Sequence, residues 1–365
     1  MKLRYFLRGF SIIAMLLSIF PFLPFDHWSI RVFDFPHLQL TVLTLIALLT
    51  YFLIFNYKNK TDYAFIILLA SCFIFQSGKI YPYTAFASHE VNSATTNSKK
   101  NVSIYTANVL QDNDDADKLL SDMANLDADV VLYTETNEKW RSMLTKVMDS
   151  TYAYKIEIPL ENTYGMLLFS KLPLYETKVR YLIEDTIPSI TAKLLLPSKD
   201  TLQLFAIHPA PPTPQHNPSS VDRDAEMMKV ALFSRKSRLP MVVMGDFNDV
   251  AWSETTALFQ KASGLLDLRK GRGFYSTYNA KNFLMRWPLD HIFTSPDFRV
   301  IAVQRGENVG SDHYPFYVNL SYEPALADEQ RLPEPTEEVL GEAFDQIENE
   351  VEQQEEEKED EVDKG

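Results

Sequence analysis

The sequence predicts an α/β layered sandwich that follows a membrane anchor of three helices, and two observations lead to this fold class. Three nearly charge-free stretches fill most of the first ninety positions, and strand-like and helix-like stretches alternate from residue 101 onward. The last part of the chain is rich in glutamate. We therefore expect a membrane anchor over 1–87, a polar tether over 88–100, a soluble domain over 101–322, and an acidic, largely disordered tail over 323–365.

The three apolar stretches cover residues 5–25, 36–55 and 63–81. Each has the length that a helix needs to cross roughly 30 Å of hydrocarbon with its backbone groups bonded internally. Alternatives are a cleaved signal peptide for the first stretch and buried core helices for the other two. No small-x-small cleavage site follows the first stretch, and three such stretches in succession favour a multi-pass anchor over residues 5–81.

The charges of the loops predict the orientation of this anchor. Lys2, Arg4 and Arg8 precede the first stretch, and the second loop carries Lys58 and Lys60. Positive residues favour the cytoplasmic side, so the N-terminus and the second loop should lie there. An odd number of spans then places the soluble domain on the far side. In a bacterium, this is the periplasmic face of the inner membrane.

Composition excludes two classes of site. The single cysteine, Cys72, rules out an intrachain disulfide framework and a cysteine-rich metal site. The formal net charge of -14 comes mainly from the tail, where 18 acidic residues stand against three basic ones. Residues 101–322 hold 23 basic and 27 acidic residues, so the domain shows no basic footprint for a nucleic-acid backbone.

The acidic tail contains a short apolar pattern. Leu340, Phe344, Ile347 and Val351 fall at helical spacing, which predicts one amphipathic helix near 337–351. Two interpretations stay open for this segment. It is either part of a disordered, solubilising tail or a helix that docks a protein partner.

Polar side chains follow several apolar, strand-like stretches of the domain, such as "VSIYTAN", "VVLYTE", "LQLFAIH" and "MVVMGDFN". Any one of them is more often structural than catalytic, because such groups satisfy loop amides. Their shared placement predicts that they meet at one edge of the sheets. Carboxylates and amides without thiolates suit Mg²⁺ or Mn²⁺, and a paired histidine and aspartate suit a general base. These residues are Asn108, Glu135, His208, Asp246, Asn248, Asp290, Asp312 and His313.

The motifs "YTANV", "YTET", "GMLLFSKLPL", "HPAPP", "GDFND", "RWPLDHIF" and "GSDHYPF" occur in this order. This set resembles the endonuclease/exonuclease/phosphatase superfamily, which includes pancreatic deoxyribonuclease, abasic-site endonucleases, neutral sphingomyelinases and inositol-polyphosphate 5-phosphatases. The resemblance covers about residues 101–322, and the anchor before them looks like that of membrane-anchored bacterial members. It implies a four-layer α/β sandwich, with two facing mixed sheets flanked by helices. It also implies hydrolysis of a phosphate ester by a metal-assisted water.

The resemblance also implies a role for each matching residue. Glu135 would hold the divalent ion, and Asn108 and Asp312 would complete or support its shell. Asn108 would also belong to the phosphate-binding group. Mg²⁺ or Mn²⁺ is the expected cofactor.

The remaining residues would carry the proton transfer and the contacts to phosphate. His313 would take the proton from the attacking water, and Asp290 would orient its imidazole. Asp246 would orient the nucleophile or serve the leaving group. Asn248 and His208 would donate to the phosphate oxygens.

Two functional classes follow from these observations. The first is a membrane-anchored, metal-dependent phosphoesterase that hydrolyses a phosphodiester in a nucleic acid or in a phospholipid or sphingolipid headgroup. The second is a non-catalytic membrane scaffold that retains the fold and binds partners through its acidic tail. The scaffold predicts the loss of at least one essential group, whereas the sequence retains the set together.

Overall fold

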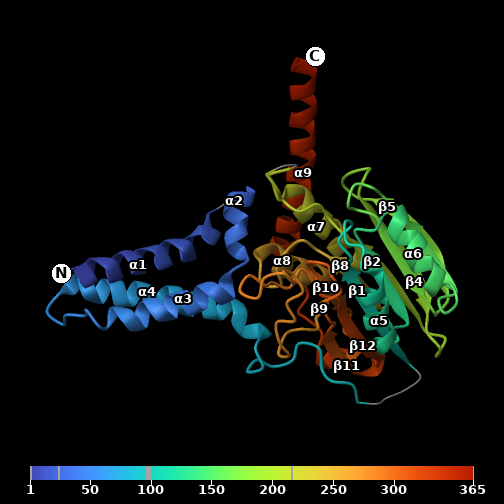
Figure 1. Ribbon diagram of the computed structural model, residues 1–365, viewed down its shortest axis with the longest axis horizontal. Coiled ribbons are helices and arrows are strands. Elements are labelled where there is room, and N and C mark those ends of the chain that lie inside the picture. Colours follow the sequence, from blue (N-terminus) through green and yellow to red (C-terminus); the bar gives the residue numbers. More distant parts are fainter. Residues whose placement is uncertain (1, 24, 96–99, 215–216, 365) are drawn as a thin grey trace. The chain divides into compact units, whose positions relative to one another are not determined.

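The computed structural model describes residues 2–23, 25–95, 100–214 and 217–364 (Figure 1). The chain divides into two compact units. The first comprises Met1–Ser88 and Pro212–Ser220, and the second comprises His89–Pro211 and Val221–Gly365. The chain therefore passes between the units three times, and a short internal segment of the soluble part belongs to the unit that holds the predicted anchor.

The second unit contains two six-stranded mixed sheets. Each has one parallel pair near its centre, β1 with β2 and β7 with β8, and its other strand pairs are antiparallel. The first sheet has the order β11 (Phe298–Arg305), β12 (Phe316–Tyr322), β1 (Asn101–Asn108), β2 (Val130–Thr134), β4 (Met166–Ser170), β3 (Tyr154–Ile158). The second has the order β5 (Leu174–Tyr181), β6 (Pro188–Leu195), β7 (Thr201–Ile207), β8 (Met241–Asp246), β10 (Asp290–Thr294), β9 (Leu266–Asp267).

The two sheets pack face to face over one apolar core. Ile104 and Leu132 of the first sheet and Leu204 and Val242 of the second belong to the same buried cluster. Because side chains alternate along a strand, the neighbouring residues point to the outer faces. Strands β2, β4 and β8 are buried along their whole length, as expected for strands covered on both faces.

Helices cover both outer faces. Helices α5 (Ala116–Leu126) and α6 (Glu138–Met148) bury their apolar sides against the first sheet, and α7 (Val221–Lys236), α8 (Glu254–Ser263) and α9 (Glu337–Lys364) cover the second. Side-chain caps explain where three of them begin, because Asp115, Asn137 and Ser253 accept hydrogen bonds from the first turns of α5, α6 and α8. The prediction of two mixed sheets flanked by helices is confirmed.

The acidic segment that was expected to be largely disordered contains helix α9. Its first half packs within the domain, where Val339, Ala343 and Ile347 join the cluster formed with α7 and α8. The apolar face differs from the predicted one, because Phe344 and Val351 are exposed. The small residue Ala343 instead makes the contact with α7 and α8, because helices can approach closely where a small side chain lies between them. The second half of α9 projects away from the sheets (Figure 1).

Part of the predicted tether is also packed. Val91 is fully buried in the core, and Ala94 N donates to Val300 O over 2.8 Å. Glu90 accepts a hydrogen bond from Asp267 N. A short 3₁₀ helix, η4 (Pro324–Glu329), follows the last strand. The domain therefore begins before residue 101, because the chain segment next to β11 and β9 supplies apolar and polar contacts.

The first unit contains three longer helices, α1 (Lys2–Ile19), α3 (His37–Tyr51) and α4 (Lys60–Ile80), which share an apolar cluster. Short helical turns lie between or after them, namely η1 (Phe20–Phe22), α2 (Trp28–Arg31), η2 (Val32–Asp34) and η3 (Tyr81–Tyr83). Two segments, Lys2–Phe22 and Lys60–Tyr83, are long and apolar enough to cross a bilayer. The structure differs from the prediction at the second span. The helices Trp28–Asp34 and His37–Tyr51 meet at an angle of 72°, and they count as a candidate membrane span only if both together form one broken span.

The internal segment Pro212–Ser220 is joined to this unit by backbone hydrogen bonds. Trp28 N donates to Pro218 O and Ser220 N donates to Asp26 O, each over 2.7 Å. His27 and Ser219 form an antiparallel bridge between these bonds. The segment immediately after the first apolar helix therefore holds a piece of chain that comes from between β7 and α7.

Candidate active site

Five of the predicted residues lie at neighbouring strand ends. Asn108 ends β1 and Glu135 directly follows β2, its parallel neighbour. His208 follows β7 and Asp246 ends β8, a second parallel pair. Asp290 begins β10, which runs antiparallel to β8 and pairs Asp290 with Asp246. The two sheets therefore deliver these side chains to one edge of the sandwich.

His313 and Asp290 form a buried pair. Nδ1 of His313 lies 2.7 Å from Oδ2 of Asp290, and both side chains are almost fully buried. Burial alone would lower the pKa of His313, but the negative charges of Asp290 and Asp246 outweigh it and raise this pKa to about 10. The Asp290 carboxylate fixes the ring through Nδ1 and leaves Nε2 as the atom that can exchange a proton.

Asp246 lies at the centre of the group. Its Oδ2 accepts a hydrogen bond from Asn108 Nδ2 over 3.0 Å, and its Oδ1 accepts one from Asn248 N over 2.9 Å. Nε2 of His313 and Nε2 of His208 lie 3.7 Å and 3.8 Å from Asp246 Oδ2. Burial opposes ionisation, but the two histidines and these hydrogen bonds outweigh it and lower the pKa of Asp246. Asp246 is thus held as a carboxylate between two imidazoles.

Asn108 links Asp246 to Glu135. The same Nδ2 donates to Glu135 Oε1 over 2.7 Å, while Asn108 Oδ1 accepts from Leu110 N over 3.0 Å. These partners fix the amide orientation, since the amide nitrogen faces two carboxylates. Burial raises the pKa of Glu135 against the opposing effect of His208. Glu135 is therefore a partly buried acid whose negative charge is only partly compensated.

The backbone is strained at two of these positions. Glu135 and Asn248 have φ angles of 58° and 52°, in the left-handed region that non-glycine residues seldom adopt. Next to them, Gly245 has φ 140°, and a Cβ there would lie 1.9 Å from Ile207 O. Such strain persists where the surroundings determine the conformation, and it clusters at functional sites.

A hard cation suits the oxygen donors of this group, and two positions are open to it. Donor atoms of Asp246, Asp290 and His313 lie within 4.8 Å of one another, which is close enough for one ion. A cation bound at His313 Nδ1 would, however, break its bond to Asp290. Glu135 is the other candidate, because a cation would compensate its partly buried charge.

The structure places two predicted residues less centrally. Among the described residues, no hydrogen bond joins the Asp312 carboxylate to Glu135 or Asn108. Asp312 is half-buried beside His313, and its charge helps to raise the pKa of His313. The side chain of Asn248 is also committed, because its Nδ2 donates to Pro209 O over 2.9 Å.

Two residues at the site were not predicted. Arg223, at the start of α7, is 2% exposed and its Nη1 donates to Asn248 O over 3.0 Å. Tyr278 lies with its ring 5.0 Å from the ring of His313. No local pattern in the sequence singled them out, since Arg223 belongs to an ordinary charged helix and Tyr278 to an irregular loop.

Other polar residues near the motifs have structural partners. His291 is fully buried, and its Nε2 lies 2.9 Å from Asp249 O on the side of β10 away from the site. The Asp249 carboxylate bonds to Ser253, the residue that caps α8. The ring of Tyr164 lies 5.4 Å from that of His208. His216 lies outside the described residues.

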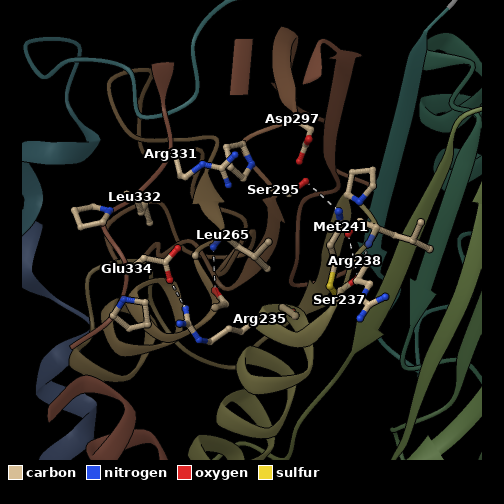
Figure 2. Close-up of a pocket in the computed structure, with 18 of the residues that line it drawn as sticks. Arg235, Ser237, Arg238, Met241, Leu265, Ser295, Asp297, Arg331, Leu332 and Glu334 are labelled. Atoms are coloured by element: carbon tan, nitrogen blue, oxygen red, sulfur yellow. Dashed lines mark hydrogen bonds and ion pairs between the residues drawn. The ribbon is translucent and has the colours of Figure 1, made fainter. Parts of the chain in front are cut away.

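A separate cavity of about 490 Å³ lies at the other ends of the same strands (Figure 2). Met241, the first residue of β8, and Ser295, just after β10, line it together with Leu265 and Arg238. Glu334 in its wall bonds to Arg235 over 3.0 Å. Asp246 and Asp290 lie at the opposite ends of β8 and β10, so this cavity is distinct from the polar group described above.

Comparison with known proteins agrees with this geometry. The profile of the Endonuclease/Exonuclease/phosphatase family matches residues 105–313. The chain belongs to this family. Its members are generally metal-dependent phosphoesterases. A search of curated proteins finds no match.

Solved structures of the family share the fold of this endonuclease/exonuclease/phosphatase protein. D. rerio TDP2 humanised by 14 mutations is 19% identical, with a TM-score of 0.51 over 61% of this chain and 100% of that one. D. rerio TDP2 in complex with a single-strand DNA product is 20% identical, with a TM-score of 0.50 over 60% and 99%. The human Nocturnin catalytic domain with bound sulfate is 15% identical, with a TM-score of 0.50 over 62% and 96%.

Proposed function

We propose that this protein is a membrane-anchored, divalent-metal-dependent phosphoesterase that hydrolyses a phosphodiester. The buried pair of His313 and Asp290, with His313 Nε2 facing Asp246, is the observation that supports this function most directly. The neighbouring link between Asn108 and Glu135 adds an acid suited to a cation. A scaffold without catalytic activity would need none of these buried charges, which are costly to bury.

The residues divide the work of hydrolysis. With a pKa of about 10, His313 is protonated without a bound cation. A cation held beside Asp246 and Glu135 would lower this pKa. Nε2 of His313 can then accept the proton of the attacking water while Asp290 holds the ring by its Nδ1. Asp246 orients the nucleophile or serves the leaving group. His208 donates to the phosphate oxygens. Asn248 orients the Asp246 carboxylate, because its backbone N–H donates to Asp246 Oδ1.

Glu135 would hold a Mg²⁺ or Mn²⁺ ion, and Asn108 would fix the direction of its carboxylate. Asp312 would support the ion through its negative charge beside His313. When bound, the ion supplies Lewis-acid stabilisation of the charge on the phosphoryl oxygens. The donor set fits this ion, since it offers buried oxygen atoms and no thiolate.

The proposed location is the bacterial inner membrane, with the catalytic domain on the periplasmic side. Loop charges support this orientation. A nucleic acid and a lipid headgroup are both phosphodiester substrates of the required chemistry. The relative solved with a single-strand DNA product supports the first, and the anchor supports the second.

The direct test is turnover of a soluble bis-aryl phosphodiester by the full-length protein in detergent, with Mg²⁺ or Mn²⁺. We expect metal-dependent turnover that EDTA abolishes and that His313→Gln reduces by roughly 10²- to 10⁴-fold, the range of a lost general base. His89→Gln, at an exposed histidine outside the site, is the matched control and should retain full activity.

Turnover of no phosphodiester by a folded protein would contradict the proposal and favour the scaffold. Single- and double-stranded DNA, RNA, glycerophospholipids and sphingomyelin complete the substrate panel. Equal activity of His313→Gln and the wild type would assign any observed turnover to a contaminant.

A further inference from the structure

The turn that follows Asp246 is held by two side chains from distant segments. Arg223, in the first turn of α7, donates from Nη1 to Asn248 O over 3.0 Å. His291, the second residue of β10, lies with Nε2 2.9 Å from Asp249 O. Two successive carbonyl groups of this turn therefore have buried partners, one on α7 and one on β10. The turn contains the left-handed backbone of Asn248, which persists only where its surroundings determine it.

The conformation of Asn248 determines where two residues of the site lie. Asn248 N donates to Asp246 Oδ1 over 2.9 Å. Its side chain donates from Nδ2 to the carbonyl of Pro209, which directly follows His208. Asn248 therefore joins the end of β8 to the end of β7. By binding the carbonyl oxygen of the same residue, Arg223 fixes this junction from the side of α7.

A second buried arginine holds the segment that carries Asp290. Arg269 is fully buried, and its Nη1 donates to Asp290 O over 3.2 Å. Its Nη2 contacts Nδ1 of His291. Because a guanidinium can only donate, Nδ1 is the accepting nitrogen of His291 and its proton lies on Nε2, which donates to Asp249 O. The imidazole is therefore neutral and has a partner at each nitrogen.

These side chains form one continuous chain of contacts on the side of β10 away from the site. Asp249 completes it, because its Oδ1 lies 3.6 Å from Arg223 Nη1. We call the following four residues the buried network: Arg269, His291, Asp249 and Arg223. One end of the network holds Asp290, and the other end holds Asp246 through Asn248. Since these two carboxylates are cross-strand partners in β10 and β8, the network links their positions.

Stability alone does not explain why two guanidinium groups are buried here. Arg223 is 2% exposed, and its Nη2 lies 2.7 Å from Asp224 Oδ1. Arg269 Nε donates to Asp267 Oδ1 over 3.2 Å. Buried ion pairs are often no more stabilising than apolar residues of similar volume, because desolvation offsets the attraction between the charges. They do fix the directions of their partners, since a planar guanidinium binds several acceptors at once.

We propose that Arg223 and Arg269 are positioning residues of the hydrolysis, and that the buried network holds Asp246 and Asp290 in fixed places relative to each other. This inference rests on the proposed function and adds to it residues that act through others. A misplacement of about 1 Å can cost roughly 10²-fold in rate, so small shifts of the network affect the reaction. Because both arginines act through the same contacts, loss of one should release much of what the other holds.

The test is a double-variant cycle on the full-length protein in detergent, with Mn²⁺ and the soluble bis-aryl phosphodiester. Lysine keeps the positive charge but cannot reproduce the planar, multiple donation of arginine. We expect Arg223→Lys and Arg269→Lys each to lower kcat by at least about tenfold and to leave KM within a few-fold, because neither arginine contacts the substrate. The double variant should lower kcat by less than the product of the two single effects.

Arg299→Lys is the matched control. Arg299 is also buried and forms an ion pair with Glu329 over 2.5 Å, but it lies on β11, in the other sheet from Asp246 and Asp290. This variant should lower the unfolding midpoint and leave kcat unchanged. Where a lysine variant of the network does not fold, the substitution to asparagine of the aspartate paired with that arginine takes its place in the cycle. These substitutions are Asp224→Asn for Arg223 and Asp267→Asn for Arg269.

An unchanged kcat in a folded variant of either arginine would overturn the inference. Single effects that simply multiply in the double variant would overturn it as well, because two unconnected supports behave in this way. A fall in kcat of Arg299→Lys as large as in the network variants would assign all the effects to lost stability and also overturn it. Absence of turnover by the wild-type protein would instead overturn the proposed function.

Discussion

At the scale of single residues, substitutions of Glu135 and Asp290 test where the proposed cation binds. Glu135 is linked to Asp246 through Asn108, whereas Asp290 is engaged by His313. We expect Glu135→Gln to weaken Mn²⁺ binding by at least about tenfold, as for loss of a ligand or its close support. Asp290→Asn should leave the affinity within a few-fold and still lower turnover. Calorimetric titration with Mn²⁺ of each full-length variant in detergent measures the affinity, and hydrolysis of the bis-aryl phosphodiester measures the turnover.

The opposite result would assign the cation to a different position. If Asp290→Asn removes binding and Glu135→Gln does not, then the ion lies among Asp246, Asp290 and His313, whose donor atoms are also close enough for it. The pair of His313 and Asp290 would then act as ligands, and the proton would have to pass to another group.

Glu226 on α7 predicts a pH dependence of stability. It is 3% exposed, and its Oε1 has no hydrogen-bond partner among the described residues. Burial, and then the charge of Glu184, raise the pKa of Glu226 from 4.5 to about 8, although Lys229 opposes the shift. The folded state therefore holds a proton that the unfolded state releases. Its stabilising effect is complete below pH 4.5 and is lost as the pH rises toward 8.

We expect Glu226→Gln to remove this pH dependence, because glutamine keeps the shape of the neutral acid. Above pH 8 the variant should be more stable than the wild type by on the order of a few kcal/mol. Chemical unfolding of both proteins in detergent at several pH values measures the difference. Parallel stability curves for the two proteins would show that Glu226 ionises normally.

At the scale of secondary-structure elements, α9 completes the second outer layer. Ala343 is fully buried against α7 and α8, and Glu350, which is 2% exposed, lies 3.4 Å from Lys229 Nζ. A chain that ends after Thr336 should lose roughly 3 kcal/mol or more of stability, since several apolar side chains become exposed. A chain that ends after Glu355 keeps these contacts and should unfold like the full chain. Thermal unfolding in detergent compares them, and equal midpoints would contradict the packing role.

At the scale of the whole molecule, the segment 212–220 pairs with the chain that follows the first apolar helix, although it lies far from this helix in the sequence. Removal of residues 1–88 would delete the backbone partners of Pro218 and Ser220. We expect protease cleavage within 212–220 to become at least about tenfold faster, because two hydrogen bonds of about 1 kcal/mol each are lost. Limited proteolysis in detergent followed by mass spectrometry measures this, with cleavage within 331–336 as the internal control. An unchanged rate would mean that the anchor does not order the segment.

The sequence by itself determined the α/β fold and the family, and it predicted most of the residues that the structure brings together in the candidate site. Alternating strands and helices predicted the α/β sandwich, and polar residues at the ends of apolar strands predicted the group around Asp246. This works because strand periodicity and strand ends are local properties that the sequence displays directly. The same holds for Lys2–Phe22 and Lys60–Tyr83, whose length and hydropathy alone mark them as candidate spans.

Tertiary structure alone decided what depends on contacts between distant segments. It decided that Arg223 and Tyr278 join the site, that Ala343 and not Phe344 faces the core, and that Pro212–Ser220 pairs with the end of the first apolar helix. None of these has a periodic signal, because each results from packing or from hydrogen bonds between segments far apart in the chain. Local patterns fix which residues are buried and where strands end, whereas only the folded chain fixes which ends meet.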